Sequence, residues 1–202
     1  MKGIAVLILA AGAARRMNQA KMLLPVGHST ILQSIIDQSK TIHPDTICIV
    51  TGFYHAEIIE KIQDDQLLFV YNEQWQEGMS ASINKGLSFL VDLNPELKAV
   101  LILVADQPYI TSALLQEMIA LQSRTNKGII AARYRGINGT PVLFTQNHFS
   151  NLEKLSGDKG ARSILLQHPD DLLTVDFPLG EIDIDTEDDY KNFVLNNGNA
   201  AG

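Results

Sequence analysis

The chain has 202 residues, of which 46% are hydrophobic and 19% are charged, and its formal net charge is −7. This composition is typical of a globular α/β domain, and the negative charge argues against nucleic-acid binding as the main role. The single cysteine, Cys48, excludes an internal disulfide and a cysteine-based zinc site, and it favours a reducing cytoplasm. No apolar run approaches the ~18 residues of a membrane span, so we expect no membrane helix. The N-terminal apolar run lacks a small-residue cleavage site in the right context and leads straight into a loop, so we expect no signal peptide.

Short apolar runs alternate with amphipathic segments along most of the chain. The predicted strands cover residues 4–9, 46–51, 67–71, 98–104 and 128–133, with further apolar pieces at 141–144 and 172–177. The predicted helices cover 31–43, 55–62, 80–91, 111–123, 147–155, 161–167 and 186–195. This alternation predicts a parallel sheet with right-handed crossovers. No linker or repeat is visible, so we expect one domain over residues 1–195 and a frayed tail at 196–202.

The first strand leads into a stretch that combines small residues with positive charge. Its members are Ala10, Ala11, Gly12, Arg15, Arg16 and Lys21. Small residues let the backbone approach a ligand closely, and peptide N–H groups together with cations suit a phosphate group. The stretch lacks the Gly-Lys-Ser/Thr of a P-loop and the three glycines of the dinucleotide fingerprint. We therefore expect a phosphate-binding loop of another kind.

The residues LAAGAARRMNQAKMLLPVG, which begin at Leu9, resemble the signature LAAG-x-x-x-R-M-G-x-x-K-x-L-L of MobA-like nucleotidyltransferases. The nearest branch contains the molybdenum cofactor cytidylyltransferases and accessory proteins of xanthine dehydrogenase and purine catabolism. Asn18 stands where the family has glycine, and asparagine tolerates a positive φ better than most residues. The resemblance implies a three-layer, mostly parallel Rossmann-like sheet of the nucleotide-diphospho-sugar transferase type.

The same resemblance implies roles for the residues of this stretch. Lys21 and Arg16 would hold the triphosphate, and the backbone around the nucleotide would come from Leu9, Ala10, Ala11 and Gly12. LAAG rather than LAGG resembles the cytidylyl branch rather than the guanylyl branch. A methyl group at Ala11 could narrow the pocket toward a pyrimidine, so CTP is the expected nucleotide.

Two acidic segments are candidates for a metal site. Asp106 follows a buried apolar run, where a carboxylate is costly unless it is paired or bound to a cation. It fits equally well a residue that caps the next helix or accepts a backbone hydrogen bond. The resemblance implies that the aspartate of this D-x-P motif binds Mg²⁺, and that a second aspartate in IDIDTEDDY completes the site. We favour Asp185 over Asp183, although the segment also fits an acidic helix cap that starts at Thr186.

The segment NEQWQEGMSASINKGL resembles the family pattern N-x-x-W-x-x-G-M-x-x-S-L. Gly78 permits a close backbone approach, and the following helix N-terminus offers free N–H groups. The resemblance implies nucleotide binding by Asn72, Gly78, Ser80 and Ser82. Trp75 fits a core aromatic or a stacking platform equally well.

Two further turns resemble acceptor-side segments of the family. Gly139-Thr140-Pro141-Val142 resembles G-x-P-V-L-F, although many members have histidine at the position of Thr140. Residues 157–162 resemble a G-D-x-G-A-R turn, and a surface turn before a helix explains them equally well. The five histidines are scattered without metal-ligand spacing, and covalent hydrolase chemistry is not indicated.

The resemblance implies Mg²⁺-dependent transfer of CMP from CTP to the phosphate of the molybdenum-pterin cofactor, with release of pyrophosphate. The product would serve molybdenum hydroxylases such as xanthine dehydrogenase, with which a transient complex is expected. Two alternatives stay open: a non-catalytic nucleotide- or cofactor-binding accessory protein, and a nucleotidyltransferase for a sugar or alditol phosphate. A nicotinamide-dependent oxidoreductase is disfavoured because G-x-G-x-x-G is missing.

Overall fold

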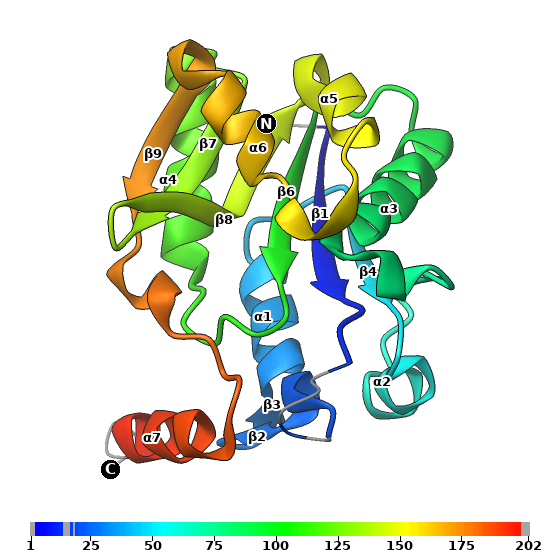
Figure 1. Cartoon of the computed structure of the whole chain (residues 1–202), viewed down its shortest axis with the longest axis vertical. Helices are drawn as coiled ribbons and strands as arrows, with labels where there is room; N and C mark the ends of the chain where they lie inside the picture. Colours follow the sequence, from blue (N-terminus) through cyan, green and yellow to red (C-terminus); the bar gives the residue numbers. More distant parts are fainter. Residues whose placement is uncertain (1–2, 14–16, 18, 199–202) are drawn as a thin grey trace.

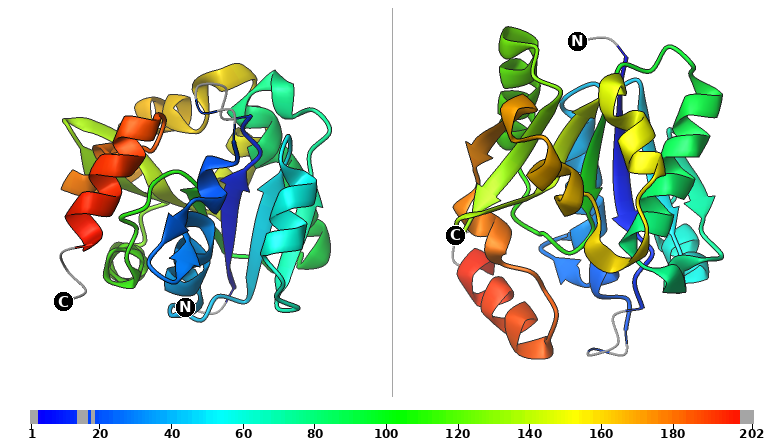
Figure 2. Two further views of the ribbon diagram at one scale, coloured as in Figure 1. Left: turned by 90° about the horizontal axis from the view of Figure 1, so that it is seen from below. Right: turned by 45° about the horizontal axis from the view of Figure 1, so that its top comes forward.

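The computed structural model describes residues 3–13, 17 and 19–198, with the side chains of residues 159 and 196–198 left aside. A central sheet carries helices on both of its faces (Figures 1 and 2). The helices are α1 (Ile31–Lys40), α2 (His55–Lys61), α3 (Met79–Leu93), α4 (Ser112–Thr125), α5 (Phe149–Glu153), α6 (Arg162–Gln167) and α7 (Glu187–Gly198). None of these helices has the length and apolar composition that a bilayer span requires.

The central sheet has seven strands in the order β5-β4-β1-β6-β8-β7-β9. Their bounds are β1 (Ile4–Ala10), β4 (Thr46–Thr51), β5 (Leu67–Tyr71), β6 (Ala99–Val104), β7 (Ile129–Tyr134), β8 (Ile137–Thr145) and β9 (Leu172–Asp176). All neighbouring pairs are parallel except the two pairs that include β8. A separate two-stranded ribbon joins β2 (Pro25–Val26) to β3 (Ser29–Thr30). The prediction of a mostly parallel sheet is confirmed.

The strand β8 is longer than the apolar piece predicted at residues 141–144. It runs over nine residues and lies antiparallel between β6 and β7. The turn before it contains Arg135 and Gly136, which both have positive φ (47° and 73°), as a tight two-residue hairpin requires. Its first half carries polar and small residues at the sheet margin, so hydrophobic patterning marks only its second half.

Strand β1 shows why the fold has three layers. Ile4, Val6 and Ile8 pack with α1 and α4 on one face of the sheet. The alternate residues Ala5, Leu7 and Leu9 pack with α3, α5 and α6 on the other face. Every residue of β1 is buried, as in strands covered by helices on both faces. Helix α3 approaches closely because residue 86 is glycine: a Cβ there would lie 2.4 Å from Leu7 Cδ1. The three-layer prediction is confirmed.

Two other predictions concern single segments. Cys48 is fully buried in β4, as expected, and burial raises the pKa of its thiol to about 12. Helix α7 continues to Gly198, three residues beyond the end predicted for the last helix at residue 195. The acidic first turn of this helix favours its extension, because negative charge at a helix N-terminus interacts well with the helix dipole. Residues 199–202 lie outside the described part.

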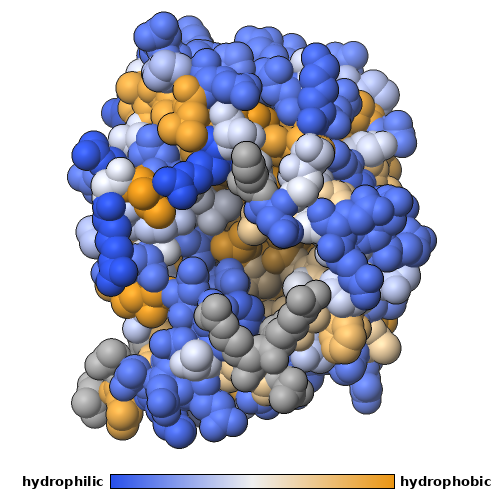
Figure 3. Space-filling model, in the orientation of Figure 1, coloured by the Kyte–Doolittle hydropathy of each residue, from blue (hydrophilic) through white to orange (hydrophobic). Residues whose placement is uncertain are grey.

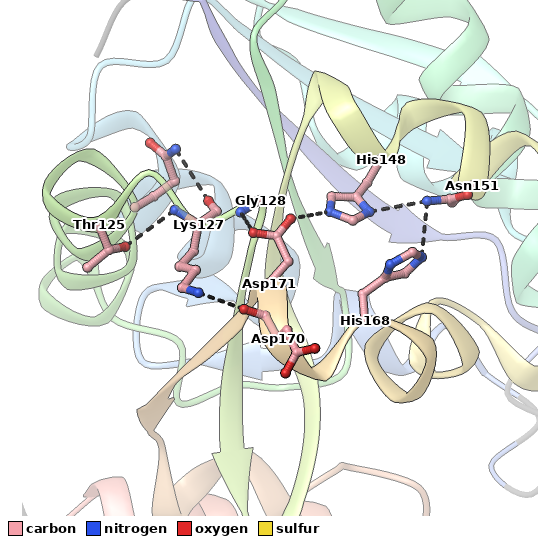
Figure 4. Close-up of polar contacts among 9 residues, drawn as sticks. Thr125, Lys127, Gly128, His148, Asn151, His168, Asp170 and Asp171 are labelled. Atoms are coloured by element: carbon pink, nitrogen blue, oxygen red, sulfur yellow. Dashed lines mark hydrogen bonds and ion pairs between the residues drawn. The ribbon is translucent and has the colours of Figure 1, made fainter.

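A polar network fastens the sheet at the amino ends of β7 and β9 (Figure 4). Asp171 accepts hydrogen bonds from the Gly128 N–H and from His148 Nε2, both at 2.8 Å. Asn151 Nδ2 lies 3.2 Å from His148 Nδ1 and 3.3 Å from His168 Nε2. Burial alone would raise the pKa of Asp171, but the contacts with Gly128 and His148 hold that pKa below its ordinary value. The network joins β7, β9 and α5 at the end of the sheet away from the carboxyl ends of the parallel strands.

Candidate active site

A cavity of about 520 Å³ opens at the carboxyl ends of β1 and β6. This is the edge of an open α/β sheet at which ligands bind. The cavity is lined by Leu9, Ala10, Ala11, Gly12, Ala13, Lys21, Met22, Trp75, Gln76, Gly78, Met79, Ser82, Val104, Ala105, Asp106, Asp158 and Asp185. The space-filling view shows a hollow with apolar atoms at its floor and a polar rim (Figure 3).

Lys21 holds together segments that lie far apart in the sequence. Its ammonium Nζ donates to Asp106 Oδ2 at 2.8 Å and to Asp185 Oδ1 at 2.7 Å, across 85 and 164 residues of chain. Its side chain is 14% exposed, against 29% for Asp106 and 47% for Asp185. Burial alone would lower the pKa of Lys21, but Asp106 and then Asp185 outweigh burial and raise that pKa above its ordinary value. Lys21 is therefore a permanent cation at neutral pH.

Asp106 reaches the site because β6 ends two residues before it. It does not cap the next helix: Thr111 caps α4, and its Oγ1 accepts from the Leu114 N–H at 3.3 Å. The backbone carbonyl of Asp106 accepts from the Ile184 N–H at 3.3 Å, which ties the loop after β6 to the late acidic segment. The helix-cap alternative for Asp106 is therefore wrong, and Asp106 instead lines the cavity, where its carboxylate pairs with Lys21.

Asp183 and Asp185 lie in different surroundings. Asp185 lines the cavity and pairs with Lys21, whereas burial and the neighbouring carboxylates Asp106 and Asp185 raise the pKa of Asp183 to about 6. The helix cap predicted to start at Thr186 is confirmed: Thr186 Oγ1 accepts from the Asp189 N–H at 3.1 Å, and Asp189 accepts from the Thr186 N–H at 2.8 Å. The capping box thus leaves Asp185 available to the cavity.

The segment after β5 contributes mainly backbone, and only one of its predicted hydroxyl groups, to the cavity. Gly78 has φ +101°, and a Cβ there would lie 2.2 Å from Asp158 Oδ1, so this turn requires glycine. Ser82 lines the cavity, but Asn72 and Ser80 are buried and are not among the residues that line it. The amide of Asn72 instead donates to Ser82 Oγ at 3.0 Å. In this structure Asn72 orients Ser82.

Several cavity residues were not predicted, or were predicted only in part. The turn at 157–162 brings Asp158 to the cavity, whereas Thr140 does not line it. Trp75 is a wall of the cavity rather than a core residue, and its ring lies 5.3 Å from that of Phe53. Ala13, Met22, Gln76 and Met79 are sequence neighbours of predicted residues, and that proximity was the available signal. Arg15, Arg16 and Asn18 lie outside the described residues.

The donor set at this edge suits a hard divalent cation. Asp106 and Asp185 supply carboxylate oxygens on either side of one ammonium. Over residues 3–13, 17 and 19–198, no group of three His, Cys, Asp or Glu side chains is arranged to hold an ion by itself. Mg²⁺ is commonly bound by one or two carboxylates together with substrate phosphates and water. The residues present therefore fit Mg²⁺ that arrives with a nucleotide.

Comparison with known proteins agrees with this geometry. The bifunctional protein GlmU of Francisella tularensis subsp. novicida is 26% identical over 167 residues, which are 82% of this chain and 35% of that protein. The chain thus spans about a third of the length of the curated relatives that it matches. The crystal structure of Rv0371c from Mycobacterium tuberculosis H37Rv superposes with a TM-score of 0.83 at 26% identity, covering 96% of this chain and 98% of that one.

A second structure of Rv0371c, a complex with manganese, has a TM-score of 0.78 at 26% identity and covers 96% of this chain and 99% of that one. The family model of the MobA-like NTP transferase domain matches residues 6–172, which include most of β1, Lys21, Asp106 and the sheet up to the start of β9. The chain therefore belongs to the MobA-like NTP transferase family.

Proposed function

We propose that this nucleotidyltransferase moves CMP from CTP to the phosphate of the molybdenum-pterin cofactor and releases pyrophosphate. The observation that carries the proposal is the cluster of Lys21, Asp106 and Asp185 on the cavity at the carboxyl edge of the sheet. A permanent cation between two carboxylates suits a reaction in which phosphate groups must be oriented and their charge balanced.

In the proposed reaction, an oxygen of the acceptor phosphate forms a bond with the α-phosphorus of CTP. The bond between that phosphorus and the bridging oxygen breaks, and pyrophosphate leaves with the electron pair. The acceptor monoester is already anionic at neutral pH, so the protein needs no strong general base. Its contribution is position and charge, which matches a cavity whose described lining includes no histidine.

Each catalytic residue has a separate task in the proposal. Two N–H groups of the Lys21 ammonium bond to carboxylates, and the third donates to the triphosphate. Arg16 is the second cation that binds the triphosphate. Leu9, Ala10, Ala11 and Gly12 present backbone to the nucleotide. Ser82, oriented by Asn72, is a hydrogen-bonding group for the base or ribose. Asp106 and Asp185 would hold Mg²⁺, which when bound offsets the negative charge of the phosphates.

The choice of CTP rests on the LAAG motif. Ala11 lines the cavity, and a Cβ at Gly52 would lie 2.9 Å from its methyl group. The methyl group thus fills space between the loop and β4, and by the proposal it narrows the pocket toward a pyrimidine. By the proposal, the product is handed in the cytoplasm to a molybdenum hydroxylase such as xanthine dehydrogenase.

A pyrophosphate-release assay with each of the four NTPs, with and without the molybdenum-pterin cofactor, tests the proposal. We expect release with CTP and the cofactor together and loss of release in Asp106→Ala, with the fold retained by circular dichroism. Equal turnover of CTP and GTP would contradict the base choice. Release with a sugar or alditol phosphate instead of the pterin would change the acceptor. Nucleotide binding without any release would indicate a non-catalytic accessory protein.

A further inference from the structure

The turn between β4 and α2 lies directly against the loop that follows β1. Ala10 of β1 pairs with Thr51 of β4, so the residues after both strands leave the sheet side by side. Residue 52 is glycine because the space is filled: a Cβ there would lie 2.5 Å from the Ala11 carbonyl oxygen and 2.7 Å from Trp75 Cβ. The β4–α2 turn is therefore the support on which the loop rests.

Two hydrogen bonds fasten the loop to this support. The Phe53 N–H donates to the Ala11 carbonyl at 3.2 Å, and the Tyr54 hydroxyl donates to the Ala13 carbonyl at 3.1 Å. The two bonds bracket Gly12, and all three loop residues line the cavity. In a trans peptide the N–H points opposite to the carbonyl, so the Gly12 N–H faces away from Phe53. The fastening thus determines the direction in which this amide group can donate.

The support itself is rigid. Tyr54 is 7% exposed, and its ring meets that of Phe53 edge to face with centroids 4.8 Å apart. The Tyr54 carbonyl accepts from the Ile58 N–H at 3.0 Å at the start of α2. The ring of Trp75, on the cavity wall, also meets that of Phe53 edge to face, with centroids 5.3 Å apart. The Tyr54 hydroxyl therefore reaches the loop from a ring that packing already holds in place.

We propose that Tyr54 is a positioning residue for nucleotide binding: its hydroxyl holds the Ala13 carbonyl back, so that the loop meets the triphosphate with its amide groups already oriented. The inference rests on the proposed binding of a nucleoside triphosphate at this cavity. Tyr54 does not line the cavity, and it acts through the loop backbone.

The test is Tyr54→Phe, which removes one oxygen atom and keeps the ring. The protein has one tryptophan, Trp75, on the cavity wall, so its fluorescence reports nucleotide binding directly. We expect the Kd of Mg·CTP, and the KM for CTP in pyrophosphate release, to rise about fivefold, the effect of one neutral hydrogen bond. The KM for the acceptor and kcat should change less than about twofold. Tyr71→Phe, at an exposed tyrosine of β5, is the matched control and should bind as wild type does.

The outcomes separate this inference from the proposed function. Equal CTP affinity in Tyr54→Phe and wild type, measured by fluorescence and checked by equilibrium dialysis, would overturn the role of Tyr54 and leave the function intact. A fall in kcat or in thermal stability with CTP affinity unchanged would assign Tyr54 a structural role only and would likewise overturn the inference. Failure of the wild-type protein to bind any NTP would contradict the proposed function itself.

Discussion

Replacing Lys21 by methionine removes the charge at the centre of the site and keeps most of the side-chain volume. The wild-type ammonium makes two charge-assisted hydrogen bonds, at 2.8 Å and 2.7 Å, to Asp106 and Asp185. Asp185 is 47% exposed, so solvent weakens its share, whereas Asp106 is 29% exposed. We expect the free energy of unfolding to fall by about 1–2 kcal/mol. For a chain of this length the melting temperature then falls by about 2–8 °C.

The same variant, Lys21→Met, should also lose activity. A hydrogen bond from a charged group to the triphosphate contributes about 1.5–3 kcal/mol, so kcat/KM should fall about 10- to 150-fold. Lys85→Met is the matched control, because Lys85 also pairs with a carboxylate, Glu73, but at 3.5 Å and with 46% of its side chain exposed. This control should keep the melting temperature and activity of the wild-type protein.

Magnesium should then discriminate between the two lysine variants. Without the ammonium, Asp106 and Asp185 are left with unbalanced charge and should bind a divalent cation more tightly. Differential scanning fluorimetry with and without millimolar MgCl₂ should show a larger stabilisation of Lys21→Met than of wild type or Lys85→Met. Identical magnesium shifts in all three proteins, or full activity in Lys21→Met, would refute the argument that these two carboxylates form one cation site.

Three further predictions follow from single residues. Gly78→Ala should lower the free energy of unfolding, measured by urea denaturation, by about 1–3 kcal/mol, because φ +101° and the contact with the opposite turn exclude a Cβ. The control is Gly12→Ala, where a Cβ meets no atom within 4 Å, and its free energy of unfolding should stay within about 0.5 kcal/mol of the wild-type value. Asp171→Asn should lower the free energy of unfolding at pH 7 by about 0.5–1 kcal/mol. The fold lowers the pKa of Asp171, so the ionised carboxylate stabilises the wild-type protein above the ordinary pKa of aspartate. This stabilisation disappears as the pH falls through the lowered pKa. Asp185→Asn should abolish most pyrophosphate release while Asp183→Asn retains it, and the reverse order would assign the second metal ligand to Asp183.

Four parallel strands could be read from the sequence almost residue for residue. The predicted ranges 4–9 and 98–104 differ by one residue from β1 and β6, which carry the cavity. The predicted ranges 46–51 and 67–71 coincide with β4 and β5. Strands buried on both faces need continuous apolar runs, and glycine, asparagine or aspartate ends each run at the sheet edge. Strand β8 followed neither rule, because it lies antiparallel and its first four residues, 137–140, are exposed or half-buried. Its existence depends on pairing with β6 and β7, which local patterning does not encode.

The site residues could be predicted one at a time, but most of their contacts could not. Nothing near Asn72 shows that its amide would turn away from the cavity to hold Ser82. Likewise, the sequence around Tyr54 carries no sign of its bond to Ala13, since that bond depends on the pairing of β1 with β4. Such lateral contacts come from the order of strands in the sheet, whereas sequence patterns report mainly on the segment that contains them.

Under the proposed function, the charges on the cavity give a physical reason for a cation to accompany the nucleotide. Among the described residues that line it are one cation, Lys21, and three carboxylates, Asp106, Asp158 and Asp185. A triphosphate approaching these residues meets a net negative wall, and the one ammonium has already given two of its three N–H donors to the carboxylates. Opposite charge must therefore come from the arginine-bearing loop or from a divalent ion that the carboxylates attract. Under the proposed function, the same carboxylates that hold Lys21 in place would therefore favour a metal-bound nucleotide over a free one.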